Sequence, residues 1–274
     1  MLSESQKASA SKLAGAAKVG RLSIFIDAGI SIPSGAPSWG GGLLETLAIK
    51  ANMNEKDRES LKSLGFLDQP TILAEGMGDK FEPAIADIIN ESSRYTPGHA
   101  LLKTVKSPSV TTNYDALYEN AAESCNQHVP TLPWDSREMI ENDHSERNSL
   151  LKLHGCVKYP ESIILSRSDY MRYPDTSLAL RGCLHGMFLT SKVLFCVFSM
   201  TDDNVHKVID DVRTFLHEKN DDQKLGTILS MTEIKMFNRL CDQDFHIHTF
   251  GKSWSDSPAW DHDCFLDNVV DCSP

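Results

Sequence analysis

Residues 22–31 read Leu22-Ser23-Ile24-Phe25-Ile26-Asp27-Ala28-Gly29-Ile30-Ser31. The first half of this stretch is a short, partly β-branched apolar run of the kind that forms a parallel strand buried on both faces. A turn that carries Gly29 follows at once, and a glycine there lets backbone amides approach a phosphate group without an intervening side chain. The stretch therefore predicts the first strand of an α/β fold, followed directly by a turn that binds a dinucleotide.

Strands and helices alternate along the rest of the chain. Apolar runs predict further strands at residues 109–112, 150–153, 163–165, 193–198 and 245–250. Apolar residues at helical spacing predict helices at residues 100–106 and 115–124, and another that contains Val205, Val208, Ile209 and Val212. This alternation favours an α/β fold with a doubly wound, mostly parallel, Rossmann-like sheet covered on both faces.

The segment after the turn has a different pattern. Residues 29–42 have a loop-like composition, and residues 43–95 carry apolar residues at helical spacing, interrupted by Gly65, Pro70 and Gly76. They predict several short helices that form a small cap subdomain inserted after the first strand and turn. We expect residues 1–20 to be an N-terminal extension and residues 21–274 to form a single nucleotide-binding domain with this helical insertion at about 43–95.

Composition narrows the class of protein. The 274 residues are 41% hydrophobic and 24% charged, as in ordinary globular chains, which argues against disorder. A formal net charge of −11 disfavours nucleic acid and anionic membrane surfaces as partners. The first 18 residues lack the apolar core of a signal peptide, and no apolar stretch is long enough to span a bilayer, so we expect a cytoplasmic protein.

The seven cysteines are scattered along the chain, and no two of them stand as C-x-x-C. Free thiols in a reducing compartment are the simplest interpretation. A structural zinc site normally uses close cysteine pairs, because two thiolates from one tight turn can reach the same ion. We therefore expect no metal.

Polar residues collect where the predicted strands end. Residues 27–31 follow the first strand, and Asn113, His154 and Ser199 each follow a later one. Because ligands of parallel α/β sheets bind outside the carboxyl ends of the strands, these four positions predict one shared site.

Each of these features also has a simpler explanation. The turn lacks G-x-G-x-x-G, and a glycine after a strand is more often only a turn. Asn113 could cap the helix expected after it, and His154 could be a structural histidine at a strand end. Trp39, which follows Gly35-Ala36-Pro37-Ser38, could be a core aromatic or a lid over the site.

Four segments, in a fixed order between about residues 22 and 250, carry a family resemblance. They are Ala28-Gly29-Ile30-Ser31 with Gly35-Ala36-Pro37-Ser38-Trp39, Val110-Thr111-Thr112-Asn113-Tyr114-Asp115, Lys152-Leu153-His154-Gly155, and Phe198-Ser199-Met200-Thr201-Asp202. Together they resemble the sirtuins and, more closely, the sirtuin-like NAD hydrolases of bacterial defence systems and some eukaryotes.

The resemblance implies an NAD site. Asn113 would bind the ribose on the nicotinamide side or position a water, and His154 would be the catalytic base, since the unperturbed pKa of histidine lies near neutrality. NAD would be the substrate, no metal would be needed, and hydrolases of this kind often assemble, so a homo-oligomer is implied. The residues expected to contact the nucleotide are Ala28, Gly29, Ile30, Ser31, Pro37, Trp39, Thr112, Asn113, Asp115, Ser199 and Asp202.

The chain departs from the family pattern near the turn. Asp27 stands where the family has the first glycine of Gly-Ala-Gly, and Val197 stands where a glycine precedes the late segment. Both add bulk where the family brings backbone close to the dinucleotide, and an inward carboxylate would face phosphate charge. The zinc cysteines of deacylating sirtuins are missing, and Ser38 and Gly40 replace the Asp and Arg of the sirtuin loop.

The sequence therefore predicts an NAD glycohydrolase that releases nicotinamide and ADP-ribose in a defence or signalling role. Two alternatives stay open. Asp27 and Val197 favour a catalytically weak module that binds NAD or ADP-ribose and regulates or assembles with a partner. The third hypothesis is an NAD-dependent protein-lysine deacylase.

Overall fold

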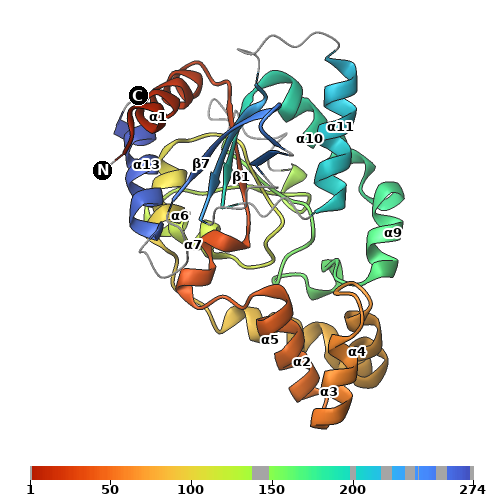
Figure 1. The fold of residues 1–274 in the computed structure, drawn as a ribbon. Helices are drawn as coiled ribbons and strands as arrows, with labels where there is room; N and C mark the ends of the chain where they lie inside the picture. The colour runs from red at the N-terminus through yellow and green to blue at the C-terminus, as the bar shows by residue number, and fades with distance from the viewer. Residues whose placement is uncertain are drawn as a thin grey trace.

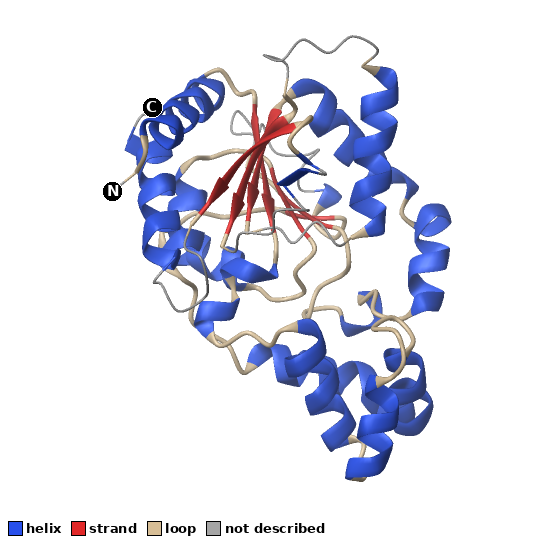
Figure 2. Cartoon of the chain, viewed as in Figure 1, coloured by secondary structure: helices blue, strands red, loops and turns tan. Residues whose placement is uncertain are grey.

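A computed structural model describes residues 2–137, 148–197, 202–216, 224–231, 238–239, 241–250 and 258–271 (Figure 1). Within these residues, seven strands form one sheet, and every strand pairing in it is parallel (Figure 2). The strands are β1 (Leu22–Ile26), β2 (Ser109–Thr111), β3 (Thr131–Leu132), β4 (Leu150–Lys152), β5 (Lys192–Cys196), β6 (Gly226–Ser230) and β7 (Phe245–Thr249).

The strand order is β3-β4-β2-β1-β5-β6-β7. The strands β2, β4 and β3 lie on one side of β1, and β5, β6 and β7 lie on the other side. This order confirms the predicted doubly wound sheet. The order in which strands are added to the sheet switches from one side of β1 to the other, so the topological switch point lies between β1 and β5. Open parallel sheets bind their ligands at such a point, outside the carboxyl ends of the strands.

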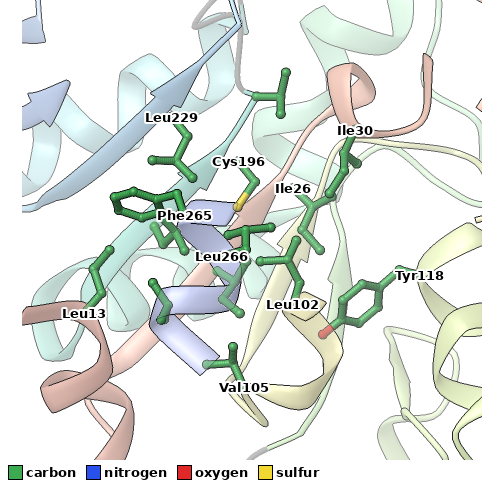
Figure 3. Close-up of a cluster of buried hydrophobic side chains, with 14 of the residues drawn as sticks. Leu13, Ile26, Ile30, Leu102, Val105, Tyr118, Cys196, Leu229, Phe265 and Leu266 are labelled. Carbon is green, nitrogen blue, oxygen red and sulfur yellow. The ribbon is translucent and has the colours of Figure 1, made fainter. Parts of the chain in front are cut away.

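Four helices cover one face of the sheet: α1 (Glu4–Lys18), α6 (Pro97–Thr104), α7 (Leu117–Ser124) and α13 (Pro258–Asp271) (Figure 1). Alternate residues of β1, among them Ile24 and Ile26, face this layer because successive strand side chains point to opposite faces. In Figure 3, Ile26 lies in the same cluster as Leu102 of α6 and Phe265 of α13. The helix α1 lies beside α13 and contributes Leu13 to the same core.

The opposite face of the sheet is covered by α10 (Leu178–Thr190) and α11 (Asp203–Phe215), and α9 (Arg167–Thr176) precedes them. Phe25 of β1 points to this side and stacks on Phe195 of β5 with ring centroids 5.2 Å apart. Val205, Val208 and Val212, spaced at helical intervals, turn the apolar face of α11 onto the sheet. Both faces are therefore covered, and the strands β1, β2 and β4 are buried at every position.

The predicted helical cap is present between β1 and α6. It consists of the π-helix η3 (Trp39–Leu44), α2 (Glu45–Lys50), α3 (Glu55–Lys62), α4 (Gln69–Met77), the short η4 (Gly78–Lys80) and α5 (Phe81–Asn90). These orange helices gather beyond one end of the sheet in Figure 1. They enclose their own apolar cluster, which includes Leu47, Leu73 and Ile85 and receives Tyr114 and Leu165 from outside the cap.

Several local predictions differ from the structure. Residues 163–165 were predicted as a strand and form none; they follow the short helix η5 (Pro160–Ser162), and their apolar character comes from packing against the cap, where Leu165 is 1% exposed. The strands β3 and β6 were missed, because β3 has only two residues and β6 begins with Gly226 and Thr227. The segment predicted as a loop contains the short helices η1 (Ala28–Ile30) and η2 (Ile32–Ser34) and the start of η3.

Candidate functional site

A cavity with a volume of about 690 Å³ lies at the carboxyl ends of β1, β2, β4, β5 and β6. The cap contributes Leu43, Phe66 and Leu67 to its wall. Most of the residues that the sequence predicted to act on or bind a nucleotide line this cavity: Ala28, Gly29, Ser31, Pro37, Trp39, Thr112, Asn113, Asp115, His154 and Asp202. Four segments that are distant in the sequence therefore meet at one place.

Two of the expected nucleotide contacts are not among these residues. Ile30 does not line this cavity but a smaller one next to it, and its side chain is 4% exposed and packs in the core beside Ile26 (Figure 3). The cause is the short helix η1, in which the Ile30 amide donates to the Asp27 carbonyl and the side chain is directed away from the cavity. Ser199 lies outside the described residues, so its contact with a nucleotide stays a prediction.

The turn after β1 makes a very close approach to the end of β5. A Cβ atom at Gly29 would lie 2.2 Å from Cγ1 of Val197 and 2.8 Å from the Val197 carbonyl oxygen, so only glycine fits there. Val197 itself has a φ of 54°, a left-handed conformation that β-branched residues rarely adopt. A glycine would take this conformation without strain, so the valine adds strain at the end of β5 and bulk beside the Gly29 turn.

Asp27 is the second departure from the family, and its carboxylate lies in the cavity wall. Its Oδ1 accepts a hydrogen bond from the Thr112 hydroxyl at 2.9 Å. Thr112 follows β2, so this bond ties the ends of two neighbouring strands together. The carboxylate thus has a structural role, and it brings negative charge to the same wall as Asp202.

The end of β2 holds Asn113 firmly. The Thr111 hydroxyl donates to the Ile26 carbonyl at 2.8 Å and accepts from the Asn113 amide at 3.0 Å. The side-chain Nδ2 of Asn113 donates to Ser31 Oγ at 3.3 Å. Asn113 is 8% exposed, and its Oδ1 accepts no hydrogen bond from any residue that the structure describes.

The capping alternative for Asn113 does not hold. The helix α7 begins at Leu117, and the amide of Leu117 donates to the Asp115 carboxylate at 3.0 Å. Asp115, rather than Asn113, therefore satisfies the first amide of the helix. A buried amide oxygen without a donor costs about 1–3 kcal/mol, which a ligand hydroxyl or a water in the cavity would relieve.

His154 follows β4 and is 2% exposed. Its Nε2 lies 3.1 Å from Oδ2 of Asp202, and its ring meets Tyr170 and Tyr173 edge-on. Burial lowers the pKa of His154, and Asp202 and Asp27 act in the opposite direction without overcoming it. The imidazole is therefore neutral near pH 7 and can accept a proton.

Tyr170 is a site residue that the sequence did not reveal. It comes from α9, lines the cavity, and its hydroxyl donates to Asp202 Oδ2 at 3.3 Å. Burial, reinforced by Asp202, raises the pKa of Tyr170, so the phenol stays protonated. No local pattern around Tyr170 distinguishes it from a packing aromatic, because only the fold brings α9 to the cavity.

Lys152 and Glu119 form a buried ion pair beneath the loop that carries Asn113. The Lys152 Nζ lies 3.0 Å from Glu119 Oε1, and the two side chains are 0% and 7% exposed. Burial acts to lower the pKa of Lys152, but Glu119 and neighbouring groups outweigh it and the pKa is raised. The same ammonium donates to the Asp115 carbonyl, so the pair braces residues 113–115 from below.

Trp39 opens the π-helix η3 and lines the cavity. Its ring lies at a tilt to Tyr114, with centroids 6.2 Å apart, and it packs against the apolar cluster of the cap. The indole Nε1 is buried and has no acceptor within the described part of the chain. Trp39 thus belongs to both the cap core and the cavity wall.

A second cavity with a volume of about 430 Å³ adjoins the first, and Gly29, Val197 and Met231 line both. Its other walls come from η2, from residues 94–97 and from His262 and Asp263 of α13. Val197 therefore lies where the two cavities meet.

Within the described ranges, no three His, Cys, Asp or Glu side chains come together as metal ligands would. In the same ranges, no helix has the length and apolarity to cross a bilayer.

A SIR2-like domain matches residues 109–247, just over half of the chain. The chain belongs to the SIR2-like domain family. The matched segment contains the ends of β2, β4 and β5, and thus Asn113, His154 and Asp202. The strand and turn at residues 22–31 lie outside this match and are placed beside it by the fold.

Individual relatives are distant. The chain is 29% identical over 213 residues to the NAD(+) hydrolase ThsA of Enterococcus faecium, covering 73% of this chain and 41% of that protein. It is 26% identical over 194 residues to the NAD(+) hydrolase ThsA of Bacillus cereus (strain MSX-D12), covering 70% and 40%. The chain thus spans about two-fifths of the length of these curated relatives. A crystal structure of a Sir2 homologue in complex with NAD aligns with 99% of this chain and 95% of its own, at 12% identity and a TM-score of 0.47.

Proposed function

We propose that this SIR2-like protein hydrolyses NAD to nicotinamide and ADP-ribose. The observation that carries the proposal is that Asn113 and His154 meet at one buried wall of a cavity at the sheet's topological switch point. Its volume of about 690 Å³ lies within the range of about 300–1,000 Å³ that is typical of small-molecule sites. The family and the names of the curated relatives agree with this assignment.

In the proposed reaction, the bond between the nicotinamide nitrogen and ribose C1′ breaks, and nicotinamide leaves with the bonding electrons. The ribose develops oxocarbenium character, a water oxygen bonds to C1′, and the water gives up a proton. Asn113 Oδ1, which lacks a donor among the described residues, would accept a hydrogen bond from a ribose hydroxyl or from the attacking water. Holding these groups in place lowers the entropy cost of the attack.

His154 is suited to take the proton. Because burial keeps its pKa below the ordinary value, the imidazole is neutral and carries a lone pair at neutral pH. Once protonated, the ring would be stabilised by Asp202, whose Oδ2 lies 3.1 Å from Nε2. Trp39 and Phe66 on the cap side would limit access of bulk water to the reacting carbon.

The test is to incubate the purified protein with NAD and quantify nicotinamide. We expect Asn113→Ala and His154→Ala to lower kcat by at least about 100-fold, which is the scale of a lost general base. Asn90→Ala and His128→Ala, at exposed positions outside the cavity, serve as matched controls. Turnover that survives unchanged in both cavity variants would refute the assignment.

A second function is favoured by the β1 turn. Asp27 places a carboxylate in the cavity wall and Val197 crowds the turn, and both oppose close approach of a pyrophosphate. A nucleotide whose pyrophosphate is held loosely would not set its ribose firmly against Asn113, so these features favour a protein that binds NAD or ADP-ribose, turns it over slowly or not at all, and regulates or assembles with a partner. Calorimetry that finds micromolar nucleotide binding in a protein without nicotinamide release would support this second function over the first.

Self-association belongs to the same proposal. The family resemblance implies a homo-oligomer, and the exposed apolar side chains of Met171, Leu178 and Phe215 lie on the helices α9 to α11. Sedimentation velocity at several protein concentrations, with and without NAD, would detect assembly and any dependence on the nucleotide.

A further inference from the structure

A chain of buried hydrogen bonds runs from Asn113 away from the cavity to the start of α6. Asn113 Nδ2 donates to Ser31 Oγ at 3.3 Å, and His99 Nε2 lies 3.4 Å from the same oxygen. On the other side of the ring, the Thr96 amide donates to His99 Nδ1 at 3.1 Å. Ser31 and His99 are each 1% exposed, so water does not compete for these contacts.

The contacts fix which ring nitrogen of His99 carries the proton. A backbone amide can only donate, so Nδ1 uses its lone pair to accept from the Thr96 amide, and the Thr96 hydroxyl, 2.8 Å from the same nitrogen, is able to donate to it as well. Burial lowers the pKa of His99 to about 4, against a smaller opposing influence of Asp263, and the nearby His262 lowers it further. The ring is therefore neutral at physiological pH, and its single proton sits on Nε2, facing Ser31.

This assignment determines what the Ser31 hydroxyl can do. The hydroxyl oxygen has two lone pairs, and it accepts from His99 Nε2 and from Asn113 Nδ2. Its own proton is then directed to a third side, and Ser31 lines the cavity. The side-chain amide of Asn113 is held with Nδ2 toward Ser31, which leaves Oδ1 as the acceptor for a ligand.

We propose that His99 is a positioning residue: through Ser31 it holds the Asn113 amide in the orientation that presents Oδ1 to the substrate. The inference rests on the proposed function, because the orientation matters for turnover only if Asn113 receives a substrate or water proton. Without the Nε2–H donor, Ser31 is held by Asn113 alone. The Asn113 amide can then flip so that its Oδ1 accepts the Ser31 proton, which removes the acceptor that the substrate needs.

A purely structural role for His99 makes a different prediction. His99 is the third residue of α6, and with Thr96 it forms a capping box at the start of that helix. The two roles use opposite nitrogens of the ring and can be separated by two substitutions. Asn at position 99 can place an acceptor near Nδ1 and keep the cap but cannot reach Ser31. Gln at position 99 is itself a capping-box residue, as Gln6 is in α1, and its longer side chain can also place an amide donor near the position of Nε2 and keep the Ser31 contact.

We expect His99→Asn to lower kcat about tenfold, the effect of about one hydrogen bond. The midpoint of thermal unfolding should stay close to that of the wild type. We expect His99→Gln to retain more of kcat than His99→Asn at a similar unfolding midpoint, because both side chains can serve the cap but only Gln can reach Ser31. If instead His99→Asn keeps the wild-type kcat, or if the two variants lose kcat equally, the positioning role is overturned.

A second measurement does not depend on turnover. The two side-chain amide proton signals of Asn113 can be assigned in a ¹H–¹⁵N spectrum by their loss in Asn113→Asp. We expect them to shift or broaden in His99→Asn and to stay near their wild-type positions in His99→Gln. Unshifted signals in His99→Asn contradict the proposal. If the wild type releases no nicotinamide, the proposed function fails, and these signals alone decide the role of His99.

Discussion

The two walls of the cavity differ in how they are built. On the β2 and β4 side, Asn113 and His154 are backed by hydrogen bonds and by the buried pair of Lys152 and Glu119. On the β1 and β5 side, the chain is crowded, because Val197 takes a left-handed conformation against Gly29, and Asp27 adds a carboxylate. We call these the braced wall and the crowded wall.

The difference separates two requirements of a nucleotide-cleaving site. Bond cleavage needs groups held in place at the ribose, and in the proposed reaction the braced wall would supply them. Binding of a pyrophosphate needs backbone amides at close range and little negative charge, and the crowded wall is poorer in both respects. We infer that substrate affinity, rather than the chemical step, is the weaker part of this site.

The largest effect should come from breaking the ion pair beneath the braced wall. Lys152→Met leaves the Glu119 carboxylate buried without its partner, which costs about 3–5 kcal/mol of unfolding free energy in buried pairs. It also removes the donor to the Asp115 carbonyl, so the loop of Asn113 loses its support. Urea unfolding measures the first effect, and nicotinamide release measures the second.

The double variant Lys152→Met with Glu119→Leu serves as the control. Replacing both members of a buried pair by apolar residues is often neutral for stability, so most of the unfolding free energy should return. Catalysis should not return, because the Asp115 carbonyl remains without its donor. If Lys152→Met alone costs less than about 1 kcal/mol, the pair does not brace this wall.

A smaller effect is expected where the walls meet at Asp202. Asp202→Asn removes the carboxylate beside His154 but keeps an oxygen that can accept from the amides of Asn204 and Val205, so the cap of α11 survives. The imidazolium that forms during the reaction loses its partner, and we expect kcat at neutral pH to fall about tenfold.

The dependence of kcat on pH should shift in a definite direction in Asp202→Asn. Burial lowers the pKa of His154, and Asp202 is the largest influence that raises it, ahead of Asp27. Without Asp202 the pKa falls further, so protonation of His154 begins at a lower pH. The acid limb of kcat against pH should therefore move to lower pH in Asp202→Asn. A shift of that limb to higher pH would contradict the role of His154 as the base.

Much of the braced wall could be predicted from the sequence, because short sequence patterns are enough to place its residues at strand ends. An apolar run followed by Asn113, and another followed by His154, place both side chains at strand ends, and parallel strands bring their carboxyl ends to one edge. The turn at Gly29 was predictable for the same reason. The cap was found because its helices carry apolar residues at helical spacing.

The remaining site residues depend on tertiary contacts that leave no local trace. Tyr170 reaches the cavity only because α9 passes beside it, and His99 looks like any polar residue in the first turn of a helix. The left-handed conformation of Val197 could not be predicted, because valine disfavours it and only packing at the end of β5 imposes it. The mistaken strand at residues 163–165 has the same origin, since burial against the cap and burial in a sheet select the same apolar residues.

The smallest expected effect is that of substitutions at Val197, where the informative result is which of two variants is more stable. At an ordinary position alanine is more stabilising than glycine by about 0.5–1 kcal/mol, because glycine loses more backbone freedom on folding. At a φ of 54° the order should reverse, since a left-handed conformation costs a residue with a Cβ about 1–2 kcal/mol. We therefore expect Val197→Gly to be more stable to urea than Val197→Ala, while both variants lower the KM for NAD by removing the isopropyl group from the space beside Gly29. A KM that is unchanged in both variants would mean that the crowded wall does not limit affinity, and the contrast between the two walls would then rest on the charge of Asp27 alone.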